Sequence, residues 1–159
     1  MGKCLTTIYF AGPDVFRPTY KTHLARVREM CVKVGVSPLF PGENDTDDSL
    51  EIFDKNLEMI HQADGIIANL NPFRSLVEPD SGTVFECAYA FAQRKFVIGV
   101  VSDMRDLITK VHEAAPDEEC LVEDFGHPLN LMLAHGLTAT VSTLKEAISV
   151  AVARAKNKS

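Results

Sequence analysis

The sequence is poor in cysteine, and its cysteines are too scattered to form a cluster. None of them belongs to a Cys-x-x-Cys pair, which argues against a disulfide scaffold or a thiolate zinc site and favours a reducing compartment. No apolar run is long enough to span a bilayer, and the first residues lead directly into a predicted strand without the pattern of a signal peptide. These absences predict a cytoplasmic protein without a membrane partner. The cysteines are Cys4, Cys31, Cys87 and Cys120.

Positive charge is also scarce, because 16 Lys and Arg residues face 22 Asp and Glu residues, which gives a net charge of −6. Nucleic acids and anionic membranes attract basic patches, so neither is expected to be the main partner. The histidines show no metal-ligand spacing, and no P-loop, dinucleotide-binding glycine fingerprint or Gly-x-Ser-x-Gly motif occurs. We therefore expect no metal and no cofactor, whereas a small neutral ligand fits this composition.

Strand-like and helix-like segments alternate along the chain, which suits a single domain over residues 1–159 with an α/β fold. The alternation predicts a mostly parallel sheet covered by helices on both faces. The predicted strands lie at 5–12, 36–40, 65–70, 96–101 and 138–141. The predicted helices lie at 24–34, 81–94, 103–114 and 129–134, with two more that start at Asp48 and at the capping box of Thr143 and Glu146.

Ligands of such sheets bind outside the carboxyl ends of the strands. Three segments are predicted to lie there: the loop after Tyr9, the loop after Phe40 and the loop that leads to Glu86. The helix that Asp48 starts is expected to bury an apolar stripe, whose members are Leu50, Phe53, Leu57 and Ile60. Candidate functional residues are therefore sought in these three loops.

Glu86 is the only charged residue between Val84 and Ala92, at the start of a predicted helix. The positive end of the helix favours an ionised carboxylate there. A partly dry carboxylate is a plausible nucleophile toward a carbon that develops positive charge. The same periodicity also fits a polar stripe that continues to Gln93, and periodicity alone leaves both interpretations open.

Asp80 and Tyr9 are the residues that could work with Glu86. Asp80 suits a helix cap, yet its spacing from Glu86 also allows both carboxylates to face one cavity, where one stays ionised and the other handles protons. Tyr9 near the end of the first strand suits the core, or its hydroxyl could orient a carboxylate. The loop from Gly12 to Phe16 has one glycine, a proline and an aspartate, so it suits an uncharged ligand better than a phosphate.

Four segments in order resemble the nucleoside 2-deoxyribosyltransferase family. Ile8 to Gly12 is similar to the first strand and loop of that family, and the stretch from Asn56 to Ile66 is similar to the helix before its third strand. Asp80-x-Gly-Thr-x-x-Glu-x-x-Tyr-Ala resembles the nucleophile motif. The segment Gly126 to Met132 resembles a late segment that reaches into a neighbouring subunit's site. The resemblance implies a flavodoxin-like, doubly wound, five-stranded fold.

The resemblance also implies roles for single residues. Glu86 would attack the anomeric carbon of a 2′-deoxynucleoside, Tyr9 would hold Glu86, and Asp80 would protonate the departing base. Asn130 would bind the sugar or position Glu86 from a neighbouring protomer, with Met132 lining the pocket. The partners implied are 2′-deoxynucleosides and free nucleobases, in a homo-oligomer with shared sites. Gly12, Phe16 and Asn56 are further substrate-binding candidates; Asn56 stands where the best-known members carry aspartate.

Two other functions fit the same architecture. A 2′-deoxynucleoside 5′-monophosphate N-glycosidase would need a phosphate site, and in that related family a serine stands where this chain has Asp80, whose charge repels phosphate. A receiver-like regulatory domain would need an acidic pair after the first strand, where this chain has Tyr9 to Gly12. Transfer of 2-deoxyribose between nucleobases through a glutamate ester is the predicted function, with the glycosidase as the alternative.

Overall fold

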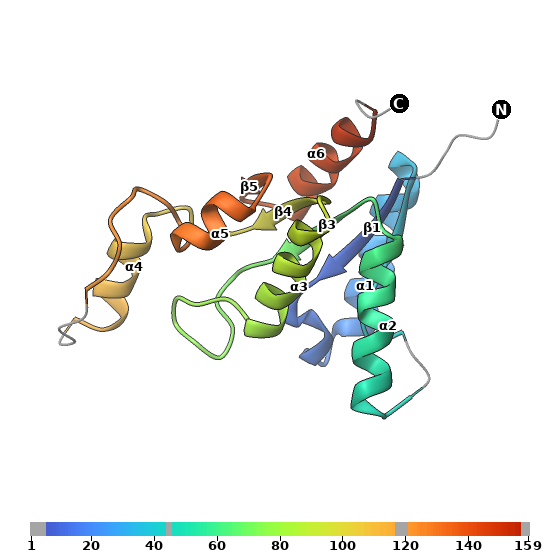
Figure 1. Ribbon diagram of the computed structural model, residues 1–159, viewed down its shortest axis with the longest axis horizontal. Coiled ribbons are helices and arrows are strands. Elements are labelled where there is room, and N and C mark those ends of the chain that lie inside the picture. Colours follow the sequence, from blue (N-terminus) through green and yellow to red (C-terminus); the bar gives the residue numbers. More distant parts are fainter. Residues whose placement is uncertain (1–5, 44–45, 117–120, 157–159) are drawn as a thin grey trace.

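The computed structural model describes residues 6–43, 46–116 and 121–156. Five strands form one sheet in the order β2-β1-β3-β4-β5, and every pairing of neighbouring strands is parallel. This confirms the flavodoxin-like α/β fold, with a sheet that is entirely rather than mostly parallel (Figure 1). The strands are β1 (Thr6–Ala11), β2 (Val36–Leu39), β3 (Gly65–Asn69), β4 (Phe96–Val100) and β5 (Ala139–Val141).

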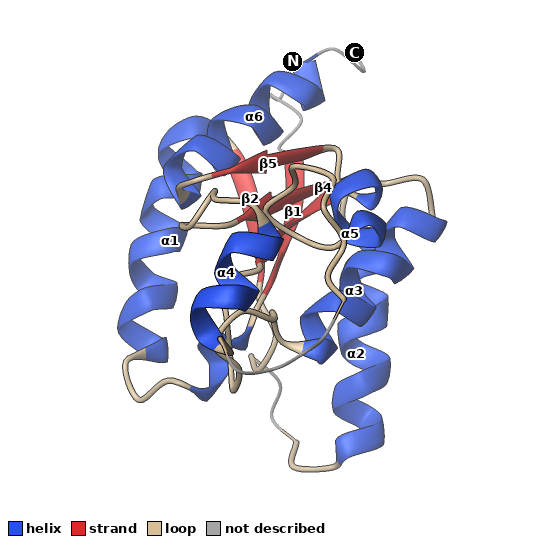
Figure 2. Ribbon diagram, turned by 90° about the vertical axis from the view of Figure 1, so that its left-hand side faces the viewer, coloured by secondary structure: helices blue, strands red, loops and turns tan. Residues whose placement is uncertain are grey.

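Helices cover both faces of the sheet, as Figure 2 shows. The helices form two groups, one on each face of the sheet. Side chains such as Ile8 and Ile98 pack against the first group, whereas Tyr9 and Ile66 pack against the second, because successive strand residues alternate between faces. The first group is α1 (Tyr20–Val34) and α6 (Leu144–Lys156). The second group is α2 (Ser49–Gln62), α3 (Ser81–Ala92) and α5 (Leu131–Gly136).

Two short elements complete the described structure. The 3-10 turn η1 (Pro13–Phe16) follows β1, and α4 (Leu107–Ala114) lies apart from the sheet at the left of Figure 1. The strand order reverses between β1 and β3, so the loops after these two strands diverge to opposite faces. A crevice at that point of the carboxyl edge is where doubly wound sheets bind ligands.

Several predicted helix ends are confirmed. Gly35 ends α1 in the left-handed conformation, with φ 77°. Asp48 caps α2 by accepting a hydrogen bond from the Glu51 N–H at 2.9 Å. The Glu146 N–H donates to Thr143 Oγ1 at 3.2 Å at the start of α6. Capping residues therefore located these boundaries well, because each satisfies a backbone group that the helix leaves open.

Other boundaries differ from the prediction. Helix α1 begins at Tyr20, before the first periodic apolar residue, and α4 begins at Leu107 rather than at 103. The Asp103 carboxylate accepts hydrogen bonds from Arg105 and so shapes a turn there. The predicted apolar stripe of α2 is only partly buried, since Ile60 is in the core but Leu50 and Phe53 are exposed.

The first and last described elements, β1 and α6, both contribute to the core, for example through Ile8 and Ala147. Pro38 lies in the edge strand β2, opposite Ile8 of β1. Of the tail that the sequence predicts over 156–159, Lys156 still belongs to α6 and the rest lies outside the described residues, as do Cys4 and Cys120. Cys31 and Cys87 are free and buried. Within the described ranges, none of the helices has the length and apolar character needed to cross a membrane.

Candidate active site

A cavity of about 390 Å³ opens at the carboxyl ends of β1 and β2, on the side of α2 and α3. All three loops that were expected at this edge contribute to it, through Gly12, Pro41 and Asp80. Helix α2 supplies a further, largely apolar wall. The volume falls within the range of small-molecule sites. The residues used below that line it are Gly12, Phe16, Pro41, Ile52, Phe53, Asn56, Leu57, Asp80, Thr83, Phe85 and Glu86.

Glu86 and Tyr9 meet at this cavity from two different elements. Tyr9 lies on β1 and is fully buried, while Glu86 lies in the second turn of α3. The Tyr9 hydroxyl donates a hydrogen bond of 2.6 Å to Glu86 Oε1. Burial and the neighbouring Glu86 both raise the pKa of Tyr9 above its usual range, so the hydroxyl keeps its proton and acts as a donor.

The ionisation of Glu86 differs from the sequence-based expectation. Burial raises the pKa of Glu86 to about 7; the hydrogen bond from Tyr9 opposes this rise, and the charge of Asp80 adds to it. Glu86 lies beyond the first turn of α3, where the stabilising effect of the helix end has faded. The carboxyl group therefore holds its proton over part of the neutral range instead of staying fully ionised.

Asp80 caps α3 and also lines the cavity, so both interpretations of this residue have a structural basis. Its Oδ2 accepts hydrogen bonds from the Thr83 N–H and from Thr83 Oγ1, each at 2.9 Å. No hydrogen bond to Oδ1 is recorded within the described part of the chain. Asp80 can therefore hold the helix end with one oxygen and offer the other to a ligand.

An aromatic cluster that the sequence did not predict surrounds Phe16. Phe16 stacks on Phe73 with 5.7 Å between the ring centroids and 16° between the planes. The Arg74 guanidinium carbon lies 4.9 Å from the Phe16 centroid and 4.7 Å from the Phe73 centroid. Phe16 is still 59% exposed, so its ring is open to further contact. Nothing in the local pattern of 71–80 pointed to this stacking, because it depends on two loops that meet only in the fold.

Asn56 reaches the cavity from α2. Its Oδ1 is buried without a hydrogen-bond partner, and it is the only side-chain atom of this kind among the described residues. An unpartnered buried acceptor costs free energy unless a ligand or water satisfies it. Because Asn56 also lines the cavity, this unsatisfied acceptor lies beside the space that a ligand would occupy. The exposed Phe53 of the same helix lines the cavity, which explains why the predicted stripe is incompletely buried.

Asn130 and Met132 do not join the other candidates within one chain. Both line a separate groove of about 750 Å³ between α3 and α5, together with Phe91 and Leu137. Asn130 caps α5, since its Oδ1 accepts a hydrogen bond from the Leu133 N–H at 3.1 Å. Met132 is 77% exposed. Neither residue lines the Glu86 cavity of its own chain.

Fold and cavity together define a class: a flavodoxin-like α/β protein with two carboxyl groups, Asp80 and Glu86, in a cavity at the carboxyl edge of the sheet. The sequence profile described as nucleoside 2-deoxyribosyltransferase matches residues 8–132, and the chain belongs to this family of enzymes. This match confirms the family resemblance that the four sequence segments indicated.

Similar solved structures support this placement. A 2-deoxyribosyltransferase from Leishmania mexicana is 38% identical, with a TM-score of 0.83 over 93% of this chain and 97% of that one. A 2-deoxyribosyltransferase from Bacillus psychrosaccharolyticus is 18% identical, with a TM-score of 0.59 over 90% of each chain. A CMP N-glycosidase from Clostridium botulinum is 14% identical, with a TM-score of 0.51 over 96% of this chain and 99% of that one. The last two are similar in fold alone.

A curated relative is longer than this chain. An uncharacterised protein of Schizosaccharomyces pombe is 32% identical over 113 residues, which cover 65% of this chain and 54% of the relative. The chain thus spans about half the length of that protein.

Proposed function

We propose that the protein transfers a 2-deoxyribosyl group between nucleobases through an ester on Glu86. The observation that carries this proposal is the short bond of 2.6 Å by which buried Tyr9 aims Glu86 into a cavity of nucleoside-binding size. A carboxylate in a largely apolar cavity is poorly solvated, which increases its reactivity toward an electron-poor carbon. Membership of the family supports the substrate class.

The first half-reaction breaks the N-glycosidic bond. One Glu86 oxygen bonds to C1′ on the face opposite the base while the C1′–N bond breaks, and its electron pair leaves with the base. Asp80 gives the departing nitrogen a proton. In the second half-reaction an incoming base nitrogen attacks C1′, the ester bond breaks, Glu86 is released, and Asp80 takes the nitrogen's proton. Two inversions give overall retention.

Asn56 and Phe16 are proposed to hold the base. The Asn56 side chain turns its covered, unpartnered Oδ1 toward an N–H of the base edge, which removes the cost of leaving that oxygen unsatisfied. The open ring of Phe16 stacks on the base, with Phe73 supporting it from another side. Gly12 lines the ligand space next to the strand end. These neutral groups suit an uncharged nucleoside.

A neighbouring copy is proposed to complete the site. Asn130 and Met132 lie outside their own chain's Glu86 cavity, on a groove whose apolar side chains Phe91 and Leu131 are exposed. Apolar surface of this kind gains free energy when a second copy covers it. Asn130 of one copy would then bind the sugar in the other, and the closed site would keep water from the ester.

Mass spectrometry tests the nucleophile directly. Mixing the protein with 2′-deoxyinosine and digesting it is expected to give a peptide that carries a 2-deoxyribosyl group on Glu86. Addition of adenine should remove the adduct and yield 2′-deoxyadenosine. Glu86→Ala should show neither, with an unchanged fold by circular dichroism. An adduct on another residue, or base exchange by Glu86→Ala, would overturn the proposal.

A further inference from the structure

Asn69 ends β3 at the switch point of the sheet, and its amide joins two loops at once. The Asn69 Nδ2 group donates a hydrogen bond of 2.8 Å to Asp14 Oδ2 in η1. On its other side, Asn69 Oδ1 accepts from Asn71 Nδ2 at 2.7 Å and from the Asn71 N–H at 3.2 Å. One side chain thus fixes η1 and the start of the β3–α3 loop to the same strand end. We call the Asp14–Asn69 hydrogen bond the clasp.

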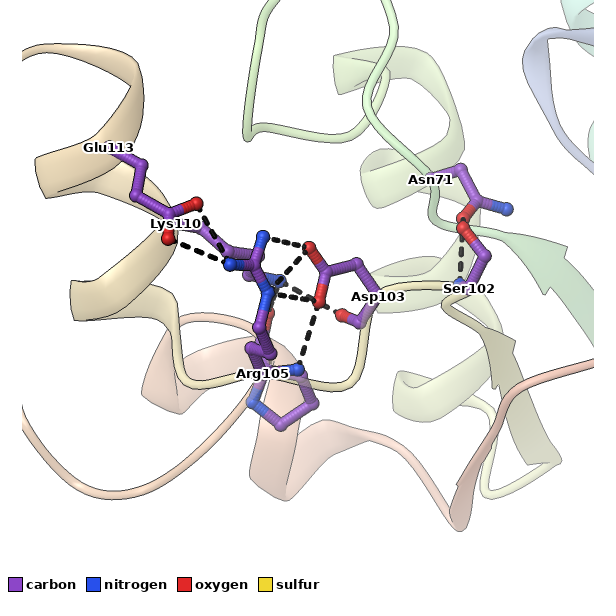
Figure 3. Close-up of polar contacts among 7 residues, drawn as sticks. Asn71, Ser102, Asp103, Arg105, Lys110 and Glu113 are labelled. Atoms are coloured by element: carbon purple, nitrogen blue, oxygen red, sulfur yellow. Dashed lines mark hydrogen bonds and ion pairs between the residues drawn. The ribbon is translucent and has the colours of Figure 1, made fainter.

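The chain of amides continues into a third loop, part of which Figure 3 shows. Asn71 Oδ1 accepts from the Ser102 N–H at 2.8 Å and from Ser102 Oγ at 2.5 Å. Beyond Ser102, Arg105 pairs with Asp103 and with Glu113 of α4, as the dashed lines in Figure 3 indicate. The loops after β1, β3 and β4 are therefore tied together. Two of them carry residues of the Glu86 cavity.

The clasp fixes the segment around Gly12, which forms a wall between two cavities. A Cβ atom at Gly12 would lie 2.9 Å from Asn69 Cβ and 3.2 Å from Asp14 Oδ2, so the loop already sits against the strand end. Behind it, toward α1, a second hollow of about 190 Å³ shares Gly12 and Pro41 with the Glu86 cavity. The segment that separates the two spaces has room to move into this hollow. The clasp, the tight fit at Gly12, the buried Pro13 and the stack of Phe16 on Phe73 oppose that movement.

We propose that Asn69 is a positioning residue that keeps this wall, with Gly12 and Phe16, closed over a substrate on Glu86; this rests on the function proposed above. The ester on Glu86 has two fates. Attack on C1′ by a base nitrogen gives a nucleoside, whereas attack by water gives free 2-deoxyribose and returns the carboxylate. When the segment with Gly12 and Phe16 keeps its position, it orients the base and excludes water. A loosened wall weakens nucleoside binding and favours hydrolysis.

An exchange of the two clasp residues tests this role. Asn69→Asp keeps the acceptor for Asn71 but places a carboxylate against Asp14, which breaks the clasp. The double variant Asn69→Asp with Asp14→Asn restores the bond with donor and acceptor reversed. Asp14→Asn alone preserves an acceptor for Asn69 and is the matched control. The measurements are KM for 2′-deoxyinosine, kcat, and the ratio of free 2-deoxyribose to 2′-deoxyadenosine when adenine is the acceptor.

The single variant Asn69→Asp is expected to raise KM and the hydrolysis ratio about tenfold each, with a smaller change in kcat. The double variant and the control should return both quantities to within about threefold of the original protein. Asp14→Ala, a change in a surface turn, should act in the same direction and serves if Asn69→Asp does not fold.

The positioning role would be overturned if folded Asn69→Asp had an unchanged KM and product ratio, or if the double variant did not recover. If Asn69→Asp does not fold, an unchanged KM and product ratio in folded Asp14→Ala would overturn it. Free sugar without any exchange in the unaltered protein would overturn the transferase function instead. In that case the KM values and their rescue still decide the role of Asn69.

Discussion

At the scale of single residues, Glu86 is under two opposing influences. Burial favours its protonated form, which cannot attack carbon, whereas the Tyr9 hydroxyl favours the reactive carboxylate. Because the pKa of Glu86 is about 7, the reactive fraction rises across the neutral range. Tyr9 therefore does more than orient the carboxylate. It lowers the pKa of Glu86 and so moves the acid limb of the pH profile to lower pH.

Removing the Tyr9 hydroxyl should shift that limb. Tyr9→Phe takes away a hydrogen bond that lowers the pKa of Glu86, so the acid limb of kcat/KM should move to higher pH. We expect a loss of about tenfold near pH 6 and a smaller loss near pH 9. Pre-steady-state rates of base release give the profile. An equal loss at both pH values would assign Tyr9 a purely steric role.

The raised pKa of Glu86 also has a consequence for stability. Between the unfolded value near 4.5 and the folded value near 7, the native state binds more protons than the unfolded state, so stability falls as pH rises through this window. Glu86→Gln removes the buried charge and should flatten that slope. We expect the variant to be about 1–3 kcal/mol more stable near pH 8 and close to the original protein near pH 4.

Urea unfolding at several pH values measures this effect. Glu58→Gln, an exposed amide substitution on α2, is a suitable control and should leave the slope unchanged. A Glu86→Gln variant whose stability keeps the original pH dependence would place the proton on another group.

At the scale of elements, the start of α3 combines a structural and a chemical task in Asp80. Oδ2 is engaged by both Thr83 donors, which stabilises the helix that carries Glu86. The geometry of α3 then turns the capping residue and the nucleophile toward one cavity. A carboxylate is needed only for the chemical task, since an amide oxygen also caps a helix.

Asp80→Asn separates the two tasks. Asparagine caps helices about as well as aspartate, so the free energy of unfolding should change by less than about 0.5 kcal/mol. Transfer between natural bases should fall by about 100-fold or more, because the departing base loses its proton donor. A substrate with a base that leaves without protonation should lose much less. If this substrate suffers equally, Asp80 acts only as a cap.

Elements marked by local signals were predictable from sequence, whereas the cavity was only partly so. Asp48 and Gly35 identify helix ends because each satisfies open backbone groups locally. The Phe16–Phe73 stack could not be predicted, since it joins residues from different loops. The raised pKa of Glu86 was missed for a related reason: periodicity places a residue on a helix but does not report how much protein covers it.

At the scale of the whole molecule, the described surface carries an exposed apolar groove between α3 and α5. Met132 and Phe91 contribute to it with exposures of 77% and 58%. Asn130 also lines this groove and does not line its own chain's Glu86 cavity. If two copies meet across this groove, assembly and completion of the active site become one event.

Met132→Glu should therefore impair assembly and activity together. A charge in an apolar contact opposes burial, and we expect about a 100-fold weaker association and a comparable loss of transfer at low protein concentration. Light scattering and an assay over a range of protein concentrations measure both. Val32→Glu alters an equally apolar, exposed position on α1 and is the control. A single-copy protein with full activity would contradict a shared site.

Pro38 bears on which surfaces two copies can use. A proline in the edge strand β2 has no N–H to donate to an incoming strand, so the ladder of backbone bonds cannot extend regularly past it. Fibril-like growth by joining sheets of successive copies is thereby discouraged at this edge. The chain can therefore keep an apolar groove open for a partner while Pro38 interrupts strand addition at the β2 edge of the sheet.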